Sequence, residues 1–221
     1  MGYCFPVWAS TYTYKAILQF RQPQVIAARG DVAEPSRTRV IVVRGRIDNE
    51  QTIKLEPSFS LTARPTVPEP GDSYRAEGLD ANGRVLFTTS FEPTVIDHAP
   101  NIRHFTVAVP LSSDVEEALS EVRVQGPAGT ATLKRAAPAT LSRAVDPARV
   151  SVTRRASEQT LTVSCPGGST RGILVLDDAT GAVLGTAVSE SMRAIAAPGA
   201  RLAVLCSDGL RTTRTSAVAP N

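Results

Sequence analysis

Histidine is scarce in this sequence. Only two of the 221 residues are histidines, His98 and His104, and no glutamate stands in helical register between them. A zinc site needs three or four converging ligands, and the H-E-x-x-H arrangement needs two histidines one helical turn apart. Zinc-dependent hydrolysis by this chain alone is therefore not expected. The G-x-S-x-G and G-x-x-x-x-G-K-[ST] motifs are also absent, which argues against a serine hydrolase and a phosphate-binding loop.

Long apolar runs and concentrated charge are missing too. The hydrophobic share is 42%, but no run approaches the roughly 18 apolar residues of a membrane span. The formal net charge is +3, and the arginines are spread along the chain. Nucleic-acid binding needs basic residues clustered on one face, so that partner is not expected. Residues 1–20 lack the basic start and apolar core of a secretory signal.

What the sequence does contain, beyond residue 38, is short segments rich in β-branched residues or alternating between apolar and polar residues. Both patterns are typical of strands, and turn signals separate the segments. Many short strands at this spacing predict a sandwich or a barrel. Strands are expected at 39–47, 53–61, 74–80, 84–91, 104–110, 121–125 and 131–134, and then at 150–154, 160–165, 172–177, 182–188, 192–196, 202–206 and 212–217.

The expected architecture is all-β: two Ig-like β-sandwich modules after a short N-terminal helical segment. Thr11–Arg21 predicts the helix, because its apolar residues follow a three–four spacing and Pro23 ends it. An alanine- and proline-rich stretch at 135–147 separates two β regions, although one elongated sandwich is the alternative. The predicted division is 1–22 for the helical segment, 23–37 for a linker, 38–140 for the first module and 141–221 for the second.

The two β regions share a local pattern. Residues 79–86 (LDANGRVL) resemble residues 176–184 (LDDATGAVL), allowing one inserted residue. A duplicated sandwich unit explains this, and so does convergence on an ordinary hairpin, because Asp, Asn and Gly are the residues that tight turns demand. The second explanation is preferred.

Three cysteines leave one without an internal partner. Cys165 and Cys206 lie in candidate strands about 40 residues apart, which suits a bridge between the two sheets of an Ig-like sandwich. Cys4 is then left over. The alternative is three reduced, buried cysteines.

The first 18 residues, MGYCFPVWASTYTYKAIL, resemble the Met-turn of metzincin zinc peptidases, and more narrowly that of a secreted bacterial group. There the Met-turn follows the zinc helix, and a β-sandwich region comes after it. The resemblance implies that Met1 forms the apolar floor beneath a zinc ion. It also implies that Tyr3 is an extra zinc ligand, if histidines from elsewhere complete the site. Gly2 stands where serine is more usual.

Taken over the whole chain, this resemblance implies the end of a catalytic domain followed by accessory modules. Residues 74–87 and 206–209 are similar to motifs of the accessory region in that family, although these are largely hairpin sequences. Zinc then belongs to the parent protein, and no cofactor is expected in this chain. The implied location is secreted or periplasmic.

Other polar residues admit two interpretations. His98 and His104 with Asp97 suit a metal or acid–base pair, but also a loop histidine and a strand-edge histidine, which is the preferred interpretation. Carboxylates on turns suit calcium, and they also close turns through backbone hydrogen bonds; turn formation is preferred. The residues concerned are Asp80, Asn82, Asp177, Asp178 and Asp208.

The first functional hypothesis is a C-terminal fragment of a secreted zinc metallopeptidase that carries non-catalytic β-sandwich modules. Its partners are the missing catalytic domain or a protein or peptide surface. The alternative is a self-contained β-sandwich binding or structural module. An exposed apolar surface separates them, because a truncated segment leaves its aromatic residues without a partner domain. These are Phe5, Trp8, Tyr12, Tyr14 and Phe20.

Overall fold

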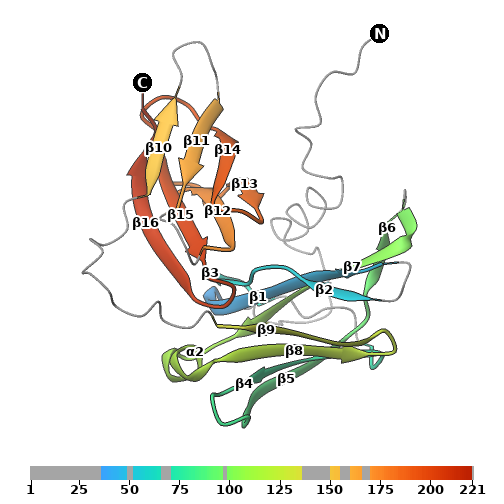
Figure 1. Ribbon diagram of the computed structural model, residues 1–221. Coiled ribbons are helices and arrows are strands. Elements are labelled where there is room, and N and C mark those ends of the chain that lie inside the picture. The colour runs from blue at the N-terminus through green and yellow to red at the C-terminus, as the bar shows by residue number, and fades with distance from the viewer. Residues whose placement is uncertain are drawn as a thin grey trace, which may run out of the picture. The chain divides into compact units, whose positions relative to one another are not determined.

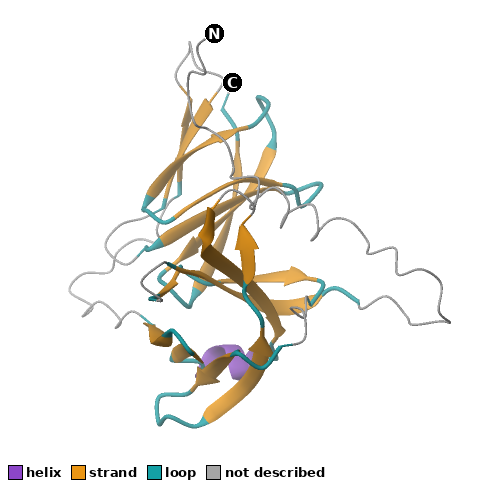
Figure 2. Cartoon of the chain, turned by 90° about the vertical axis from the view of Figure 1, so that its right-hand side faces the viewer, coloured by secondary structure: helices purple, strands orange, loops and turns teal. Residues whose placement is uncertain are grey.

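The computed structural model describes residues 36–48, 52–65, 71–96, 99–135, 150–154, 160–165 and 170–220. Strands dominate this part of the chain, and they pair antiparallel (Figure 1). The described elements also include one short helix, α2 (Ser113–Ala118), drawn in purple in Figure 2. The all-β class predicted from the alternating sequence is confirmed. Residues Arg37–Asn221 form one compact unit.

Two sheets face each other in the first sandwich, and Figure 1 shows one below the other. Sheet A has the order β2-β1-β7-β6, and β3 also pairs with β1. Sheet B has the order β5-β4-β8-β9. The strands of sheet A are β1 (Thr38–Ile47), β2 (Ile53–Leu55), β3 (Phe59–Ala63), β6 (Thr94–Ile96) and β7 (Ala99–Pro110). Those of sheet B are β4 (Tyr74–Leu79), β5 (Val85–Phe91), β8 (Glu121–Gly126) and β9 (Gly129–Lys134).

The core of the first sandwich is built from the facing sides of these sheets. Period-two alternation turns Ile41 and Val43 of β1 inward, and Val122 and Val124 of β8 meet them from sheet B. Three aromatic rings fill the centre: Phe91 lies 5.9 Å from Tyr74 and 4.9 Å from Phe105 between ring centroids. All three are buried.

The second sandwich also has two sheets. Sheet C has the order β10-β11-β14 and sheet D the order β13-β12-β15-β16. Inward residues of β11, β12, β14 and β15 form its core, which in the described residues holds aliphatic side chains and a cystine but no aromatic ring. The strands are β10 (Ser151–Arg154), β11 (Thr160–Ser164), β12 (Gly172–Asp177), β13 (Val183–Ala187), β14 (Ser191–Ile195), β15 (Arg201–Ser207) and β16 (Thr212–Val218).

The expected strand at 53–61 is wrong as a single element. The structure has two strands, β2 and β3, which both pair with β1 on the same side. Pro57 lies between them, and proline cannot donate a ladder hydrogen bond, so the strand is interrupted there.

Two elements were not predicted. One is the short edge strand β6, and the other is helix α2 (Ser113–Ala118). The side chain of Ser112 accepts a hydrogen bond from the backbone of Val115 at the start of α2. A serine cap followed by Asp114 and Glu116 was the available signal.

The predicted helix at Thr11–Arg21 and the boundary near residue 22 lie outside the described residues. So does the stretch 136–149, which holds the predicted boundary between the modules. The described strands form two groups with separate cores, while the predicted residue bounds of the modules stay a prediction.

The two similar segments form hairpins at equivalent places in sheets B and D. In each, an aspartate where the first strand ends accepts backbone N–H bonds: Asp80, just after β4, from Asn82 and Arg84, and Asp177, the last residue of β12, from Ala179 and Thr180. A glycine with positive φ completes each turn, Gly83 at 81° and Gly181 at 70°. Both ladders also shift register just before the turn.

Candidate functional site

An apolar cluster and several hydrogen bonds join the two sandwiches. The outer face of sheet A carries Phe59 and Leu61 on β3, and these pack against the outer face of sheet D. Phe59 is 2% exposed although it points away from its own core. The residues that meet it from sheet D are Leu174, Leu176, Ala203 and Leu205. We call this contact and the hydrogen bonds around it the junction.

The free edge of β3 is covered by the turn between β15 and β16. The backbone N–H of Ser58 donates to the carbonyl of Gly209 (2.8 Å), and that of Ser60 donates to Thr212 Oγ1 (2.9 Å). Ser207 Oγ donates to the carbonyl of Ser58 (2.6 Å). Ser58, Ser60 and Ser207 are at most 2% exposed. An edge strand presents unpaired backbone groups, so the turn supplies partners that β3 lacks.

The turn itself is held in shape by Asp208. Its Oδ1 accepts the backbone N–H groups of Leu210 (3.0 Å) and Arg211 (2.8 Å). Leu210 is 3% exposed and belongs to the hydrophobic core of the first sandwich. The second sandwich therefore inserts one of its own side chains into the core of the first.

Gly172 shows how closely the two sandwiches approach. A β-carbon at this position, the first residue of β12, would lie 2.8 Å from Cβ of Pro57 and 3.2 Å from Cζ of Phe59. Real β-carbons do not approach so closely, and the proline ring is rigid. The junction thus requires a residue without a side chain here.

Arg44 is the charged member of the junction. Its guanidinium forms an ion pair with Glu56 (3.0 Å), lies 5.5 Å from the ring centroid of Phe59 and donates to Thr186 Oγ1 of β13 (3.2 Å). Burial lowers the pKa of Arg44, and Glu56 partly opposes that shift. Arg44 therefore contacts Glu56, the ring of Phe59 and Thr186 at the same time, and a buried charge needs such partners.

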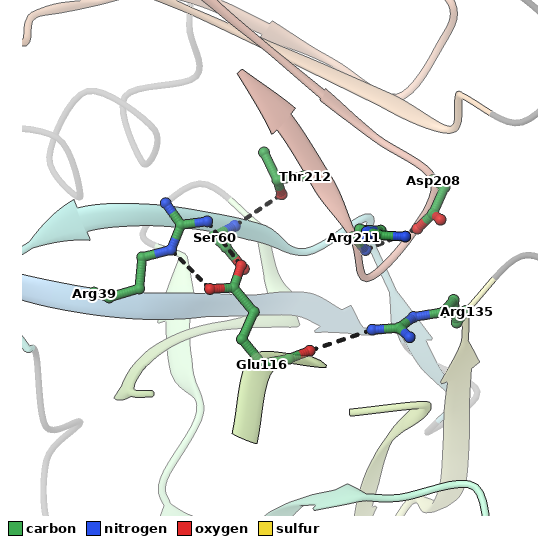
Figure 3. A network of polar contacts seen from close by, with 7 residues as sticks. All are labelled: Arg39, Ser60, Glu116, Arg135, Asp208, Arg211 and Thr212. Atoms are coloured by element: carbon green, nitrogen blue, oxygen red, sulfur yellow. Dashed lines mark hydrogen bonds and ion pairs between the residues drawn. The ribbon is translucent and has the colours of Figure 1, made fainter. Parts of the chain in front are cut away.

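A second polar network lies beside the junction (Figure 3). Arg39 donates to both carboxylate oxygens of Glu116 (2.9 and 2.7 Å), while Arg135 donates to the carbonyls of Glu116 and Glu117 at the end of α2. The hydrogen bond from Arg39 lowers the pKa of Glu116, and Glu116 in turn raises that of Arg39. The network fixes α2, and its carboxylate is held ionised as a hydrogen-bond acceptor.

The positions of the sequence-predicted site residues are as follows. Met1, Tyr3 and Cys4 lie outside the described residues, as do Asp97 and His98. His104 is described: it lies on β7, paired with Arg46 of β1 and Thr94 of β6, and is half-buried. Burial lowers the pKa of His104.

The proposed calcium ligands serve turns in the described chain. Asp80, Asp177 and Asp208 each accept backbone N–H groups of their own turns. Asp178 forms an ion pair with Arg214 (2.6 Å). Among the described residues, no group of three or more His, Cys, Asp or Glu is placed to hold a metal ion.

Cys165 and Cys206 are joined by a disulfide, with 5.9 Å between their Cα atoms. Cys165 follows β11 of sheet C and Cys206 lies on β15 of sheet D, so the bond links the two sheets across the second core. Cys206 directly precedes Ser207, the buried serine of the junction.

Sequence reasoning did not find the junction. The alternation of apolar and polar residues does not distinguish its serines from other strand or turn serines. The sequence predicts Gly172 only as the first residue of a strand. One signal was available: the Ser-Asp-Gly-Leu turn keeps an apolar residue where polar residues are usual. That apolar residue is the one buried in the neighbouring sandwich.

No family model matches this chain, and no curated protein matches it. Within the described part of the chain, no helix has the length and apolar character needed to cross a membrane.

Proposed function

We propose that this chain carries the non-catalytic accessory region of a secreted, metzincin-type zinc metallopeptidase. The observation that carries the proposal is the Met-turn-like segment MGYCFPVWASTYTY, because Met-x-Tyr followed by Cys-x-Pro-x-Trp is a specific combination. By that resemblance, the zinc and its histidines belong to the parent protein, and the location is extracellular or periplasmic.

The geometry supports a mechanical role for the two sandwiches. Three hydrogen bonds cross between the two sandwiches at buried or half-buried residues: Ser60 N–H to Thr212 Oγ1, Ser207 Oγ to the carbonyl of Ser58, and Arg44 to Thr186 Oγ1. Such contacts hold two modules in one orientation, which is what a rigid spacer or a docking platform for a catalytic domain requires. A catalytic task would instead need convergent titratable groups in a cleft.

Zinc content and peptide hydrolysis of the purified chain, each with and without a chelator, test the proposal. We expect no stoichiometric zinc and no chelator-sensitive hydrolysis from this chain. In the natural transcript, we expect H-E-x-x-H-x-x-G-x-x-H to be encoded on the N-terminal side of Met1. Stoichiometric zinc with chelator-sensitive hydrolysis would contradict the accessory role.

The second candidate is a self-contained β-sandwich binding or structural module. The observation in its favour is that residues Arg37–Asn221 form one compact unit with their own hydrophobic cores. Trp8 is the only tryptophan in the chain and therefore reports on the N-terminal segment alone. Strong quenching of its fluorescence by acrylamide supports the peptidase assignment, and weak quenching supports the self-contained module.

A further inference from the structure

Three basic side chains lie in one row across the outer face of sheet A. Arg46 of β1 stands directly opposite Lys54 of β2 on one side and directly opposite His104 of β7 on the other. Thr94 of β6 continues the row beyond His104. Arg46 and Lys54 are exposed, and His104 is half-buried. We call Lys54, Arg46 and His104 the basic row.

This arrangement breaks a rule of sheet stability. Like charges directly opposite each other on neighbouring strands are destabilising, and Arg46 and Lys54 form such a pair. Lys54 has Asp48 as an ion-pair partner (2.6 Å), and Glu56 is engaged by Arg44. Arg46 forms no ion pair with any carboxylate in the described residues. Lys54 is thus compensated by Asp48, whereas Arg46 is not within the described part of the chain, and an uncompensated position of this kind is expected at functional sites.

The row is also continuous with the part of sheet A that packs against the second sandwich of the same chain. Arg44 lies two residues before Arg46 on the same face of β1 and reaches Thr186 of the second sandwich. The apolar end of this face is covered by sheet D, while the basic end is exposed. The exposed hydroxyl-bearing residues Thr94 and Thr106 flank it with neutral hydrogen-bonding groups.

We propose that the basic row docks an acidic peptide segment of a partner protein, whose carboxylates pair with Arg46 and, in competition with Asp48, with Lys54. Strands in a sheet are spaced by about 4.8 Å, so cations on neighbouring strands can meet carboxylates on one extended peptide. Arginine binds a carboxylate through two parallel hydrogen bonds, so Arg46 is expected to contribute most to the binding of the peptide. A nucleic acid fits less well, because the row holds only three basic side chains and a nucleic-acid backbone needs a longer basic patch.

Fluorescence anisotropy with the full chain tests the proposal. The probe is a short labelled peptide that alternates glutamate and serine, and the same peptide with glutamine in place of glutamate is the reference. We expect the acidic peptide alone to bind, and high salt to weaken it because exposed charges are screened. Arg46→Gln should weaken binding about two- to fivefold, the range of one exposed ion pair, and Arg46→Glu should weaken it further.

Arg75→Glu is the matched control. Arg75 is an exposed arginine on β4 in the other sheet of the same sandwich. The residues opposite it on the neighbouring strands, Ser90 and Gln125, are uncharged, and it lies 3.8 Å from Glu77 on its own strand. This variant should leave binding unchanged. Equal loss with Arg75→Glu and Arg46→Glu would show a general charge effect and would overturn the proposal.

Thermal unfolding supplies a second, independent measurement. Because the Arg46–Lys54 opposition destabilises the sheet, Arg46→Gln should raise the melting temperature while it weakens peptide binding. A lower melting temperature with unchanged binding would overturn the proposal. A short single-stranded oligonucleotide that binds as tightly as the peptide, and loses affinity with the same variants, would also overturn the assignment to a peptide. The proposal does not depend on the peptidase origin, so a failure of the zinc tests leaves it standing.

Discussion

The two sandwiches use the same strand order in one sheet and stabilise their cores differently. Sheets B and D both place a hairpin at one side, with the order β5-β4-β8-β9 in the first and β13-β12-β15-β16 in the second. The first core is filled by a cluster of three aromatic rings. The described part of the second core has smaller aliphatic side chains and the Cys165–Cys206 bond. A small core buries less apolar surface, and a covalent link compensates for that.

The opposite sheets differ in connectivity. In sheet A the central strand β1 comes first in the chain and its edge partners β2 and β3 follow it, whereas in sheet C the edge strand β10 precedes the central strand β11. The later edge strand β3 is the one whose Phe59 and backbone enter the junction. Contact between the sandwiches therefore joins one sheet of each kind: sheet A, whose connectivity differs from that of sheet C, and sheet D, which shares its strand order with sheet B.

Removal of the central aromatic ring should have the largest effect. Phe91 is fully buried between Tyr74 and Phe105. Phe91→Ala should reduce the free energy of unfolding of the first sandwich by about 3–5 kcal/mol, because it removes buried surface and leaves a cavity. Urea denaturation measures the total change in the free energy of unfolding. Hydrogen exchange should show that protection is lost in sheets A and B. Equal loss of protection in sheet C would contradict two separately stabilised cores.

Loss of the disulfide should have the second-largest effect on stability, and this effect should lie in the second sandwich instead of the first. The double variant Cys165→Ala and Cys206→Ala should cost about 2–4 kcal/mol, since an open chain gains conformational freedom when unfolded. Hydrogen exchange should increase in sheets C and D and remain low near Phe91. Cys4→Ala serves as the control for thiol removal, and it should leave the protection of the second sandwich unchanged.

The contact between the sandwiches can be tested at Gly172. Gly172→Ala forces a β-carbon against Pro57 and should destabilise the junction by about 1–3 kcal/mol, the usual cost of overpacking. We expect calorimetry to resolve two unfolding transitions where the unaltered protein shows one. Gly185→Ala is the matched control: its β-carbon would press on the flexible end of Met192 and make an ordinary contact with the carbonyl of Arg193 (3.6 Å), both within the second sandwich. Two transitions in the control as well would show that the junction is not the cause.

The smallest effect is expected at the paired hairpins. Hydrogen bonds from backbone N–H groups lower the pKa of Asp80 and of Asp177, with the largest contributions from Arg84 and Thr180. A carboxyl with a lowered folded-state pKa stabilises the fold above its unfolded pKa of about 3.9, and that contribution is lost as the pH falls through the lower folded value. Asp80→Asn and Asp177→Asn should each flatten the acid dependence of the melting temperature. A steeper dependence in either variant would argue against these turns as its source.

Much of the fold was accessible from the sequence. The strands of both β regions and the turns at Gly83 and Gly181 followed from alternation and turn chemistry, because such signals depend on neighbours in the chain. The single strand expected at 53–61 failed because Pro57 breaks it and β1 pairs with both pieces. Helix α2 was missed because it is short, and six residues carry little periodic signal.

For the candidate site the outcome is different. The pairing of Cys165 and Cys206 was one of two interpretations of the sequence, and the structure has the bond. The zinc-related residues Met1 and Tyr3 stay predictions. The junction and the basic row were not foreseen, because a residue pattern does not state which strands will lie opposite each other.

The sequence by itself therefore determined the all-β class, the positions of most strands and the chemistry of the hairpins, since those depend on residues within a few positions of each other. The tertiary structure decided which surfaces meet. Ser207 bonds to Ser58 across 149 positions, and Ser60 bonds to Thr212 across 152. The opposition of Arg46 to Lys54 and His104 likewise appears only when the strands pair in register. Contacts over such separations arise from packing of complete sheets, and no local pattern encodes them.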